Sequence, residues 1–416
     1  MSTIPETGGR AGARPRPRVA FFGHDCTEST VIKRARAFQS AGLEVMGFTF
    51  RRRKFNRDYV PQWQDVSLGE TVDRHYGLRL LRLVQALPKL ARERRRLAEA
   101  DFFYARNIDM CALAFLARAI ARSRAPVVYE VLDVQRVFTG RGPIAFLFRL
   151  AERLILARIA LLVVSSRAFI THYFAPVQGH AWPWFLLENK ILDLDQATRS
   201  ARPTPESPRG PACPPHGPWV IAWLGNLRCP RSPQLLTAIA RKLGDRVRIH
   251  IHGFPTETGL ERFLEMIAGH HNIVYAGEYR SPDDLPRIYE QAHFAWAFDY
   301  LDMGTNSAWL LPNRLYEGCY FGTPALAARG TEAGRRVEEQ GLGWTVDEPV
   351  DLAVVRLLRT LDVESYVARR RHLLALPSAL FLDEGDTGEL CQRVLDEARA
   401  VETKADVVAT ARRAGL

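Results

Sequence analysis

Short apolar runs alternate with segments of helical periodicity along most of the chain. The run RVAFFG (residues 18–23) precedes VIKRARAFQSAG (31–42), whose apolar positions recur every three to four residues, and LEVMGFTF (43–50) follows. This order predicts a β-α-β unit, in which a helix joins two parallel strands. The first loop of such a unit lies at the carboxyl edge of the sheet, where α/β proteins bind ligands.

The same alternation continues and then restarts after a proline-rich stretch. The further predicted strands are at residues 101–107, 126–131, 159–166, 218–225, 246–253, 272–277 and 293–298. The predicted helices between them are at residues 111–123, 145–158, 232–243, 258–269 and 282–292, and the chain beyond residue 351 is mostly helical in pattern. These elements predict two doubly wound α/β domains.

Composition sharpens the predicted boundaries. A chain of 416 residues that is 47% hydrophobic suits two cores. We predict a disordered tail (1–17), a first domain (18–196), a proline-rich linker (197–218) and a second domain (219–385). One option for the last helix (386–416) is to pack back on the first domain.

Cysteine usage and apolar segments address the compartment. The six cysteines are scattered, with no C-x-x-C pair and no histidine spacing typical of a zinc site, so we interpret them as reduced thiols. The first 17 residues lack the apolar segment of a secretory signal, and the apolar run 144–164 is interrupted by charged side chains. We therefore expect no transmembrane segment and a cytoplasmic protein.

The stretch WLGNLRCPRSPQLL (223–236) is the first candidate for chemistry. Gly225 ends a predicted strand and a helix begins near Ser232, so free backbone N–H groups and the cations of Arg228 and Arg231 suit a diphosphate. The alternative is a surface loop with solvated arginines. A P-loop is excluded because the chain has no G-x-x-x-x-G-K-[ST] motif.

The second candidate is the stretch AWAFDYLDMGTNSAWLLPNRLYEGCYFGTP (295–324). A helix is expected to begin behind Pro312, and Glu317 one turn later could accept both hydroxyls of a ribose. The alternative for Glu317 is a buried helical acid paired with Arg314, three residues earlier.

These two stretches resemble a known family. PNRLYEGCYFGTPALA (312–327) is similar to the P-N-K-L-x-E-x-x-x-x-G-x-P-V element of GT-B glycosyltransferases of the family-4 type, and WLGNLRCPRSPQLL resembles their diphosphate loop. VVSSRAF (163–169) resembles the last strand of their acceptor domain. GNLR, NSAWLLPNRLYEG and YEVLD most resemble the glycosyltransferases of bacterial exopolysaccharide assembly of the succinoglycan type. The resemblance implies the GT-B architecture: two Rossmann-like domains facing across a cleft, with C-terminal helices.

The resemblance also assigns roles by position. It implies a nucleoside diphosphate sugar as donor, with Glu317 on the nucleotide ribose. The remaining donor-binding residues that it implies are Gly225, Asn226, Arg228 and Arg231 at the diphosphate, and Asn306, Ser307, Asn313 and Arg314 at the sugar and phosphate. We expect no metal and no other cofactor, because arginines and a helix N-terminus can neutralise the diphosphate; the pair Asp299 and Asp302 is the weak counterexample.

One departure from the family concerns catalysis. Retaining members often carry an acid eight positions before the ribose-binding glutamate, and here that position is Trp309. An inverting mechanism then needs a base in the first domain, for which Asp133 is the first choice and Asp25 the second, unless no single residue serves. The other residues predicted on the acceptor side are Gly23, His24 as another candidate base, and Glu130 as either a candidate base or a buried orienting acid.

The net charge of +11 favours an acidic partner. Two basic stretches lie in the first domain, residues 51–57 and residues 78–100, and the second is an amphipathic pattern broken by Pro88. Such a helix can lie on an anionic membrane; the alternative is a solvated arginine face over core leucines. No nucleic-acid recognition motif accompanies the charge, so we expect no nucleic-acid partner.

Together these patterns predict a cytoplasmic glycosyltransferase, with a peripheral position on the inner face of the plasma membrane as one option. It would move a hexose from a nucleoside diphosphate sugar to a lipid-linked glycan in surface polysaccharide biosynthesis. The alternatives are a nucleotide-sugar epimerase of the same fold and a catalytically inert partner that binds a nucleotide sugar.

Overall fold

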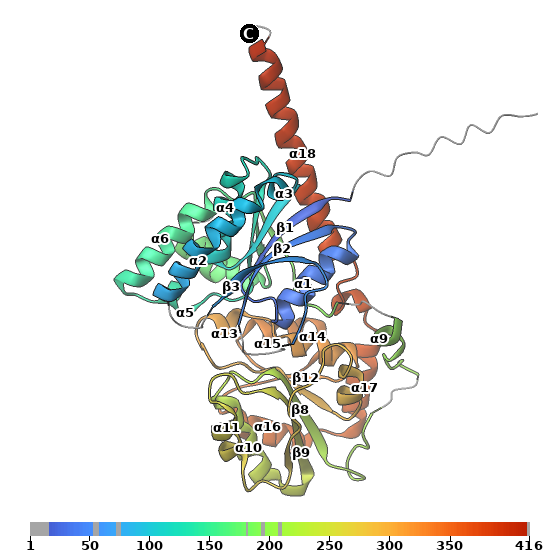
Figure 1. Cartoon of the computed structure of the whole chain (residues 1–416). Helices are drawn as coiled ribbons and strands as arrows, with labels where there is room; N and C mark the ends of the chain where they lie inside the picture. The colour runs from blue at the N-terminus through green and yellow to red at the C-terminus, as the bar shows by residue number, and fades with distance from the viewer. Residues whose placement is uncertain are drawn as a thin grey trace, which may run out of the picture. The chain divides into compact units, whose positions relative to one another are not determined.

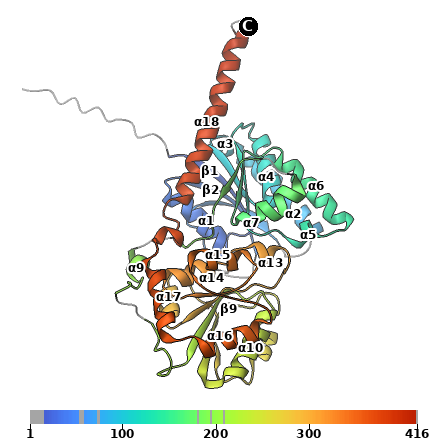
Figure 2. The same cartoon turned by 180° about the vertical axis from the view of Figure 1, so that it is seen from behind.

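The structure is a computed structural model that describes residues 16–52, 58–71, 76–179, 182–192, 196–206 and 210–413. Most of the basic stretch 51–57 and nearly all of the predicted tail lie outside the described residues. The chain divides into two compact units: residues 1–128 with 391–416 (unit 1), and residues 129–390 (unit 2). Figures 1 and 2 show the elements from opposite sides.

Two parallel sheets organise the chain. The first has the strand order β3-β2-β1-β4-β5-β6-β7 and the second the order β10-β9-β8-β11-β12-β13. The strands of the first sheet are β1 (Arg18–Gly23), β2 (Glu44–Arg51), β3 (Gln64–Glu70), β4 (Phe102–Arg106), β5 (Val127–Val131), β6 (Leu161–Val164) and β7 (Trp184–Leu186). Those of the second are β8 (Trp219–Asn226), β9 (Val247–Phe254), β10 (Ile273–Tyr275), β11 (Phe294–Trp296), β12 (Ala325–Ala328) and β13 (Gly343–Val346).

Helices connect these strands in both sheets. Up to the proline-rich stretch they are α1 (Ser29–Ser40), α2 (Tyr76–Arg92), α3 (Arg94–Ala98), α4 (Ile108–Ile120), α5 (Arg136–Thr139), α6 (Pro143–Leu156), α7 (Arg167–Phe169), a π-helical turn (Ile170–Phe174), α8 (Ala175–Gln178) and α9 (Gln196–Ser200). Later helices are α10 (Arg231–Leu243), α11 (Leu260–Ile267), α12 (Leu285–Glu290), α13 (Asn306–Trp309), α14 (Asn313–Tyr320), α15 (Glu332–Gln340), α16 (Val350–Thr360), α17 (Val363–Ala375) and α18 (Asp386–Arg413). The described ranges also contain 3₁₀ turns at Gly244–Arg246 and Ser378–Leu380.

The second sheet is covered on both faces, as expected for a parallel sheet. One face packs against α10, α11 and α16 around the buried indoles of Trp219, Trp223 and Trp296. The other packs against α12, α14 and α15 around Tyr289 and Tyr316. Figure 1 shows α10, α11 and α16 on one side of β8 and β9, and α14 and α15 on the other. The two doubly wound parallel sheets confirm the predicted α/β fold class.

The structure corrects the sequence analysis at several elements. The helix expected to break at Pro88 continues through it to Arg92, because the flanking Ala86 and Leu90 are buried and packing outweighs the lost backbone hydrogen bond. Strands β3, β7, β12 and β13 were not predicted. Three of them have only three or four residues, too few for a clear period. None of the helices in the described ranges is long and apolar enough to cross a membrane.

Candidate functional site

The loop between β8 and α10 begins at a close approach of two strands. Gly225 has φ +108°, a conformation that favours glycine, and on β9 a Cβ added at Gly253 would lie 1.9 Å from the Gly225 carbonyl oxygen. Both positions therefore require glycine. At the carboxyl end of β8, Gly225 is partly exposed and Asn226 is exposed.

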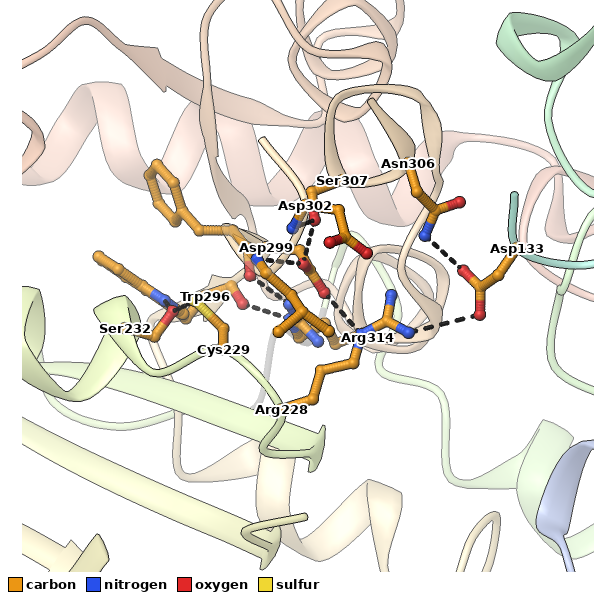
Figure 3. Close-up of polar contacts among 12 residues, drawn as sticks. Asp133, Arg228, Cys229, Ser232, Trp296, Asp299, Asp302, Asn306, Ser307 and Arg314 are labelled. Carbon is orange, nitrogen blue, oxygen red and sulfur yellow. Dashed lines mark hydrogen bonds and ion pairs between the residues drawn. The ribbon is translucent and has the colours of Figure 1, made fainter. Parts of the chain in front are cut away.

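Arg228 in this loop bridges two carboxylates. Its Nε donates to Asp299 Oδ2 at 3.0 Å and its Nη1 to Asp133 Oδ2 at 3.4 Å, as Figure 3 shows. The charge of Asp133, followed by that of Asp299, raises the pKa of Arg228 above its ordinary value. A guanidinium carries five N–H groups, so these contacts leave donors for an anionic ligand.

Asp299, just beyond β11, fixes Arg228 from the buried side. Its Oδ1 accepts from Ser307 Oγ at 2.6 Å and from the Leu301 backbone N–H at 3.1 Å. Burial by itself raises the pKa of Asp299, but the charges of Arg228 and Arg314 outweigh it, and the pKa is lowered overall. Asp299 is therefore a carboxylate that holds the cation, the loop and Ser307 together.

This lowered pKa gives a testable dependence of stability on pH. Asp299→Asn is expected to lower the free energy of unfolding by about 1 to 3 kcal/mol at pH 7, since it leaves Arg228 without its buried carboxylate partner. The carboxylate stabilises the fold above its unfolded pKa, about 3.9, and this stabilisation is lost as the pH falls through the lower folded pKa. Urea unfolding should thus show a wild-type advantage that is constant above about pH 5 and shrinks at more acid pH. The exposed Asp245→Asn is the control, and an equal loss at every pH would contradict this role.

Asn306, at the start of α13, connects this cluster to Asp133. Its Oδ1 accepts from the Val134 backbone N–H at 2.8 Å, and its Nδ2 donates to Asp133 Oδ1 at 2.9 Å. The Asp133 side chain keeps 44% exposure. Three residues predicted from separate segments, Asp133, Arg228 and Asn306, thus lie in one connected group within unit 2.

Arg314 and Glu317 lie on α14, which begins directly after Pro312 as predicted. Arg314 donates from Nε to the Trp296 carbonyl at 2.6 Å and also to the Phe298 carbonyl, so it holds the end of β11. Burial lowers its pKa, and Asp299 offsets part of that effect. The neighbouring Glu317 is buried, and after burial itself its charge is the main cause that raises the pKa of Tyr279 and of Tyr289.

Trp309 is held by the segment that follows β6. Its carbonyl accepts from Ser166 Oγ at 2.6 Å, and its indole stacks on His172 with ring centroids 5.7 Å apart and planes at 11°. Position 309, where the resemblance implies an acid in retaining members, is therefore an indole stacked on His172.

Two other predicted donor residues make separate contacts. Arg231 Nη2 donates to Glu348 at 2.7 Å, and its guanidinium lies 4.5 Å from the ring centroid of Tyr300. Asn313 Oδ1 accepts from Asn189 Nδ2. Neither contact joins the group around Arg228. Donor binding by Arg231 and Asn313 therefore stays a prediction.

The predicted acceptor-side residues are in both units. In unit 1, Gly23 ends β1, and His24 contacts Glu28 through Nε2 and Asn107 through Nδ1, the latter at 3.1 Å. Asp25 is buried, and its Oδ1 accepts from the backbone N–H of Thr27 at 3.0 Å, among other donors.

Both ring nitrogens of His24 are engaged in these contacts. The Asp25 carboxylate stabilises the loop, because it accepts hydrogen bonds from Thr27 and from the Arg52 backbone N–H. In unit 2, Glu130 lies on β5 and is buried, as expected. Its orienting role stays a prediction. Of the candidate bases, Asp133 is therefore the one with an accessible carboxylate.

The interactions of three residues were missed: Asp299 with Arg228, Tyr279 with Glu317, and His172 with Trp309. Asp299 carried one signal, a carboxylate directly after a strand, but its partner Arg228 is 71 residues away in sequence. Asp299 and Asp302 face arginines: Asp302 contacts Arg136. Within the described ranges, no group of three or more histidine, cysteine, aspartate or glutamate residues could hold a metal ion. The expectation that the protein uses no metal stays a prediction.

Comparison with known proteins decides the family. The chain is 33% identical over 380 residues to the succinoglycan biosynthesis protein ExoL of Rhizobium meliloti (strain 1021), covering 91% of this chain and 93% of ExoL. The chain belongs to the succinoglycan-type GT-B glycosyltransferases. No protein-family model matches this glycosyltransferase.

Solved structures share its fold at low sequence identity. Sucrose-phosphate synthase from Thermosynechococcus elongatus has a TM-score of 0.68 at 14% identity, covering 92% of this glycosyltransferase and 100% of the synthase. HepE from Anabaena, in complex with UDP and glucose, has a TM-score of 0.64 at 12% identity, covering 91% and 99%. The predicted family, fold and enzyme class are confirmed, and the coarse function is glycosyl transfer in exopolysaccharide biosynthesis.

Proposed function

We propose that this glycosyltransferase moves a hexose from a nucleoside diphosphate sugar to a lipid-linked glycan, with inversion at the anomeric carbon. The observation that carries the proposal is the connected group of Asp299, Arg228, Asp133 and Asn306 at the carboxyl ends of β8 and β11 and beyond β5. It places a fixed cation next to an accessible carboxylate. Inverting transfer requires a group that stabilises the anionic leaving group and a group that accepts the proton of the acceptor hydroxyl.

Donor binding is proposed at the β8–α10 loop. Arg228, already oriented by Asp299, neutralises the diphosphate, and the main chain at Gly225 and Asn226 allows close approach. The complex of HepE with UDP and glucose supports a donor of this class for the shared fold. Arg231, Asn313 and Ser307 are proposed as further contacts to the phosphate and sugar.

Glu317 is proposed to hold the ribose of the nucleotide. A carboxylate can accept hydrogen bonds from both ribose hydroxyls, and such bonds to a charged group contribute about 1.5 to 3 kcal/mol. Glu317→Gln is therefore expected to raise the Kd of the nucleoside diphosphate by about 10- to 100-fold in calorimetry. Glu339→Gln on α15, which removes an exposed carboxylate paired with Arg335, should leave the Kd unchanged. An unaltered Kd for folded Glu317→Gln would remove the ribose assignment.

The catalytic step is proposed to use Asp133 as the base. An acceptor hydroxyl gives its proton to the Asp133 carboxylate while its oxygen forms a bond to the anomeric carbon. The bond from that carbon to the donor phosphate breaks, and the nucleoside diphosphate leaves with the electron pair beside Arg228. Trp309, stacked on His172, offers no carboxylate for the opposite, retaining course.

The acceptor and location complete the proposal. We place the enzyme in the cytoplasm, peripheral on an anionic membrane where a lipid-linked glycan is available. The exposed Leu80, Leu81 and Val84 beside Arg82 on α2 support a membrane contact.

Product analysis tests this function. With a hexose donor and a lipid-linked acceptor, the product should be an elongated glycan whose new linkage has the anomeric configuration opposite to that of the donor, as determined by NMR. Conversion of the donor alone to its epimer would favour the epimerase, and donor binding without transfer to any acceptor would favour the inert partner.

A further inference from the structure

Helix α6 (Pro143–Leu156) directs most of its large apolar side chains away from the protein interior, although Leu156 at its end is buried. Five of them are between 42% and 64% exposed: Ile144, Phe146, Leu147, Leu150 and Leu154. Leu147, Leu150 and Leu154 have the spacing of a single helical face. We call these five side chains the α6 apolar face.

The opposite, inward side of α6 carries a fixed polar group. Glu152 is buried and accepts from Tyr129 Oη at 3.0 Å, Tyr173 Oη at 2.5 Å and Gln178 Nε2 at 2.7 Å. One turn earlier, Arg149 donates to the carbonyls of two residues near α5. Rotating the helix to bury its leucines would leave the Glu152 carboxylate unsatisfied, so the α6 apolar face is held outward.

The sequence around α6 carries mostly positive charge. Between Asp133 and Glu188 the sequence contains six arginines, and its single acidic residue is the buried Glu152. Arg141, Arg153 and Arg158 are exposed on or next to α6. Arg153 and Arg158 each donate one hydrogen bond to a nearby backbone carbonyl. Each guanidinium has five N–H groups, so it can also bind an external anion.

We propose that the α6 apolar face and its three arginines bind an anionic lipid bilayer. Exposed aliphatic and aromatic side chains can enter the boundary between headgroups and acyl chains while arginines at their edge contact anionic headgroups. This surface deepens the membrane part of the proposed function by adding α6 to the contact proposed for α2, and it does not depend on the identity of the donor.

Charge favours lipid over a second copy of the chain. In a twofold contact the same patch meets itself, so the arginines of one copy would approach those of the other. A lipid surface instead supplies the negative charge that the patch lacks.

Vesicle flotation of the full-length protein tests the proposal in the absence of donor and acceptor. Wild type is expected to float with phosphatidylcholine vesicles that contain phosphatidylglycerol, and to float less in high salt or with phosphatidylcholine alone. The variant Leu147→Gln/Leu150→Gln/Leu154→Gln should lose at least about tenfold in vesicle partitioning. Arg141→Gln/Arg153→Gln/Arg158→Gln should lose the preference for phosphatidylglycerol.

The chain offers a matched control with the same chemistry elsewhere. Leu260, Leu264 and Leu352 are similarly exposed on α11 and α16, so replacing these three by glutamine should leave flotation unchanged. Equal flotation of wild type and the α6 leucine variant would overturn the proposal. The proposal would also be overturned if the wild type were a dimer that does not bind vesicles and the α6 leucine variant were a monomer. Transfer to a water-soluble acceptor would persist in either case, so failure here is distinguishable from failure of the proposed function.

Discussion

Asp133→Asn is expected to lower kcat for hexose transfer by about 10²- to 10⁴-fold, the usual contribution of a general base. The amide can still accept from Asn306, so the local fold should persist. Arg228 keeps its contact to Asp299 at 3.0 Å, and loss of the nearby negative charge of Asp133 cannot weaken attraction for a diphosphate. The Kd of the donor should therefore be unchanged or slightly lower. Steady-state transfer assays and calorimetry on the same protein measure the two effects.

Asp25→Asn is the comparison for this variant. The Asp25 carboxylate is buried and accepts hydrogen bonds from Thr27 and from the Arg52 backbone N–H. Its loss should therefore lower the melting temperature and leave the kcat of the folded protein nearly unchanged. A folded Asp25→Asn protein with no transfer, beside an active Asp133→Asn protein, would contradict the assignment and move the base to Asp25.

Arg228→Met should have the largest effect on donor binding. Truncating one partner of a mostly buried charge pair costs about 2 to 5 kcal/mol, which corresponds to an increase in Kd of about 30- to 4,000-fold. The change also leaves Asp299 buried without its cation, so a lower thermal stability is expected. Calorimetric titration of the nucleoside diphosphate measures the first effect and thermal unfolding the second.

Two further variants separate binding from folding. Arg228→Lys keeps the positive charge but not the guanidinium fork, so it should fold better than Arg228→Met and still bind the diphosphate more weakly than wild type. Arg262→Met removes an exposed arginine of α11 that pairs with Glu265, and it should leave the Kd unaffected. A normal Kd in both Arg228 variants would show that the diphosphate binds elsewhere.

The parts of the fold with local signals were predictable from sequence. Strand β1 was predicted with its observed bounds, and the start of α14 was marked by Pro312, which presets the backbone for a helix. Gly225 was recognised because a glycine at a strand end allows a ligand to approach. Each of these signals depends on a few adjacent residues.

Long-range contacts were not predictable in the same way. The hydrogen bond from Asn306 to Asp133 spans 173 positions, and nothing in a single sequence relates those two residues. The outward leucines of α6 were not predicted for a related reason: the apolar period predicts a helix, but the buried hydrogen bonds of Glu152, made to distant residues, help to determine which face points inward. The continuation of α2 through Pro88 likewise depends on packing.

The central claim is that this glycosyltransferase binds a nucleoside diphosphate sugar through the loop of Arg228. Calorimetric titration of nucleoside diphosphate sugars, beginning with UDP-glucose, into wild type and Arg228→Met tests it most directly. The account predicts saturable binding of at least one such sugar to wild type and a Kd at least about 30-fold higher in the variant. Absence of binding by every nucleoside diphosphate sugar to folded wild-type protein, or equal Kd values in the two proteins, would contradict it.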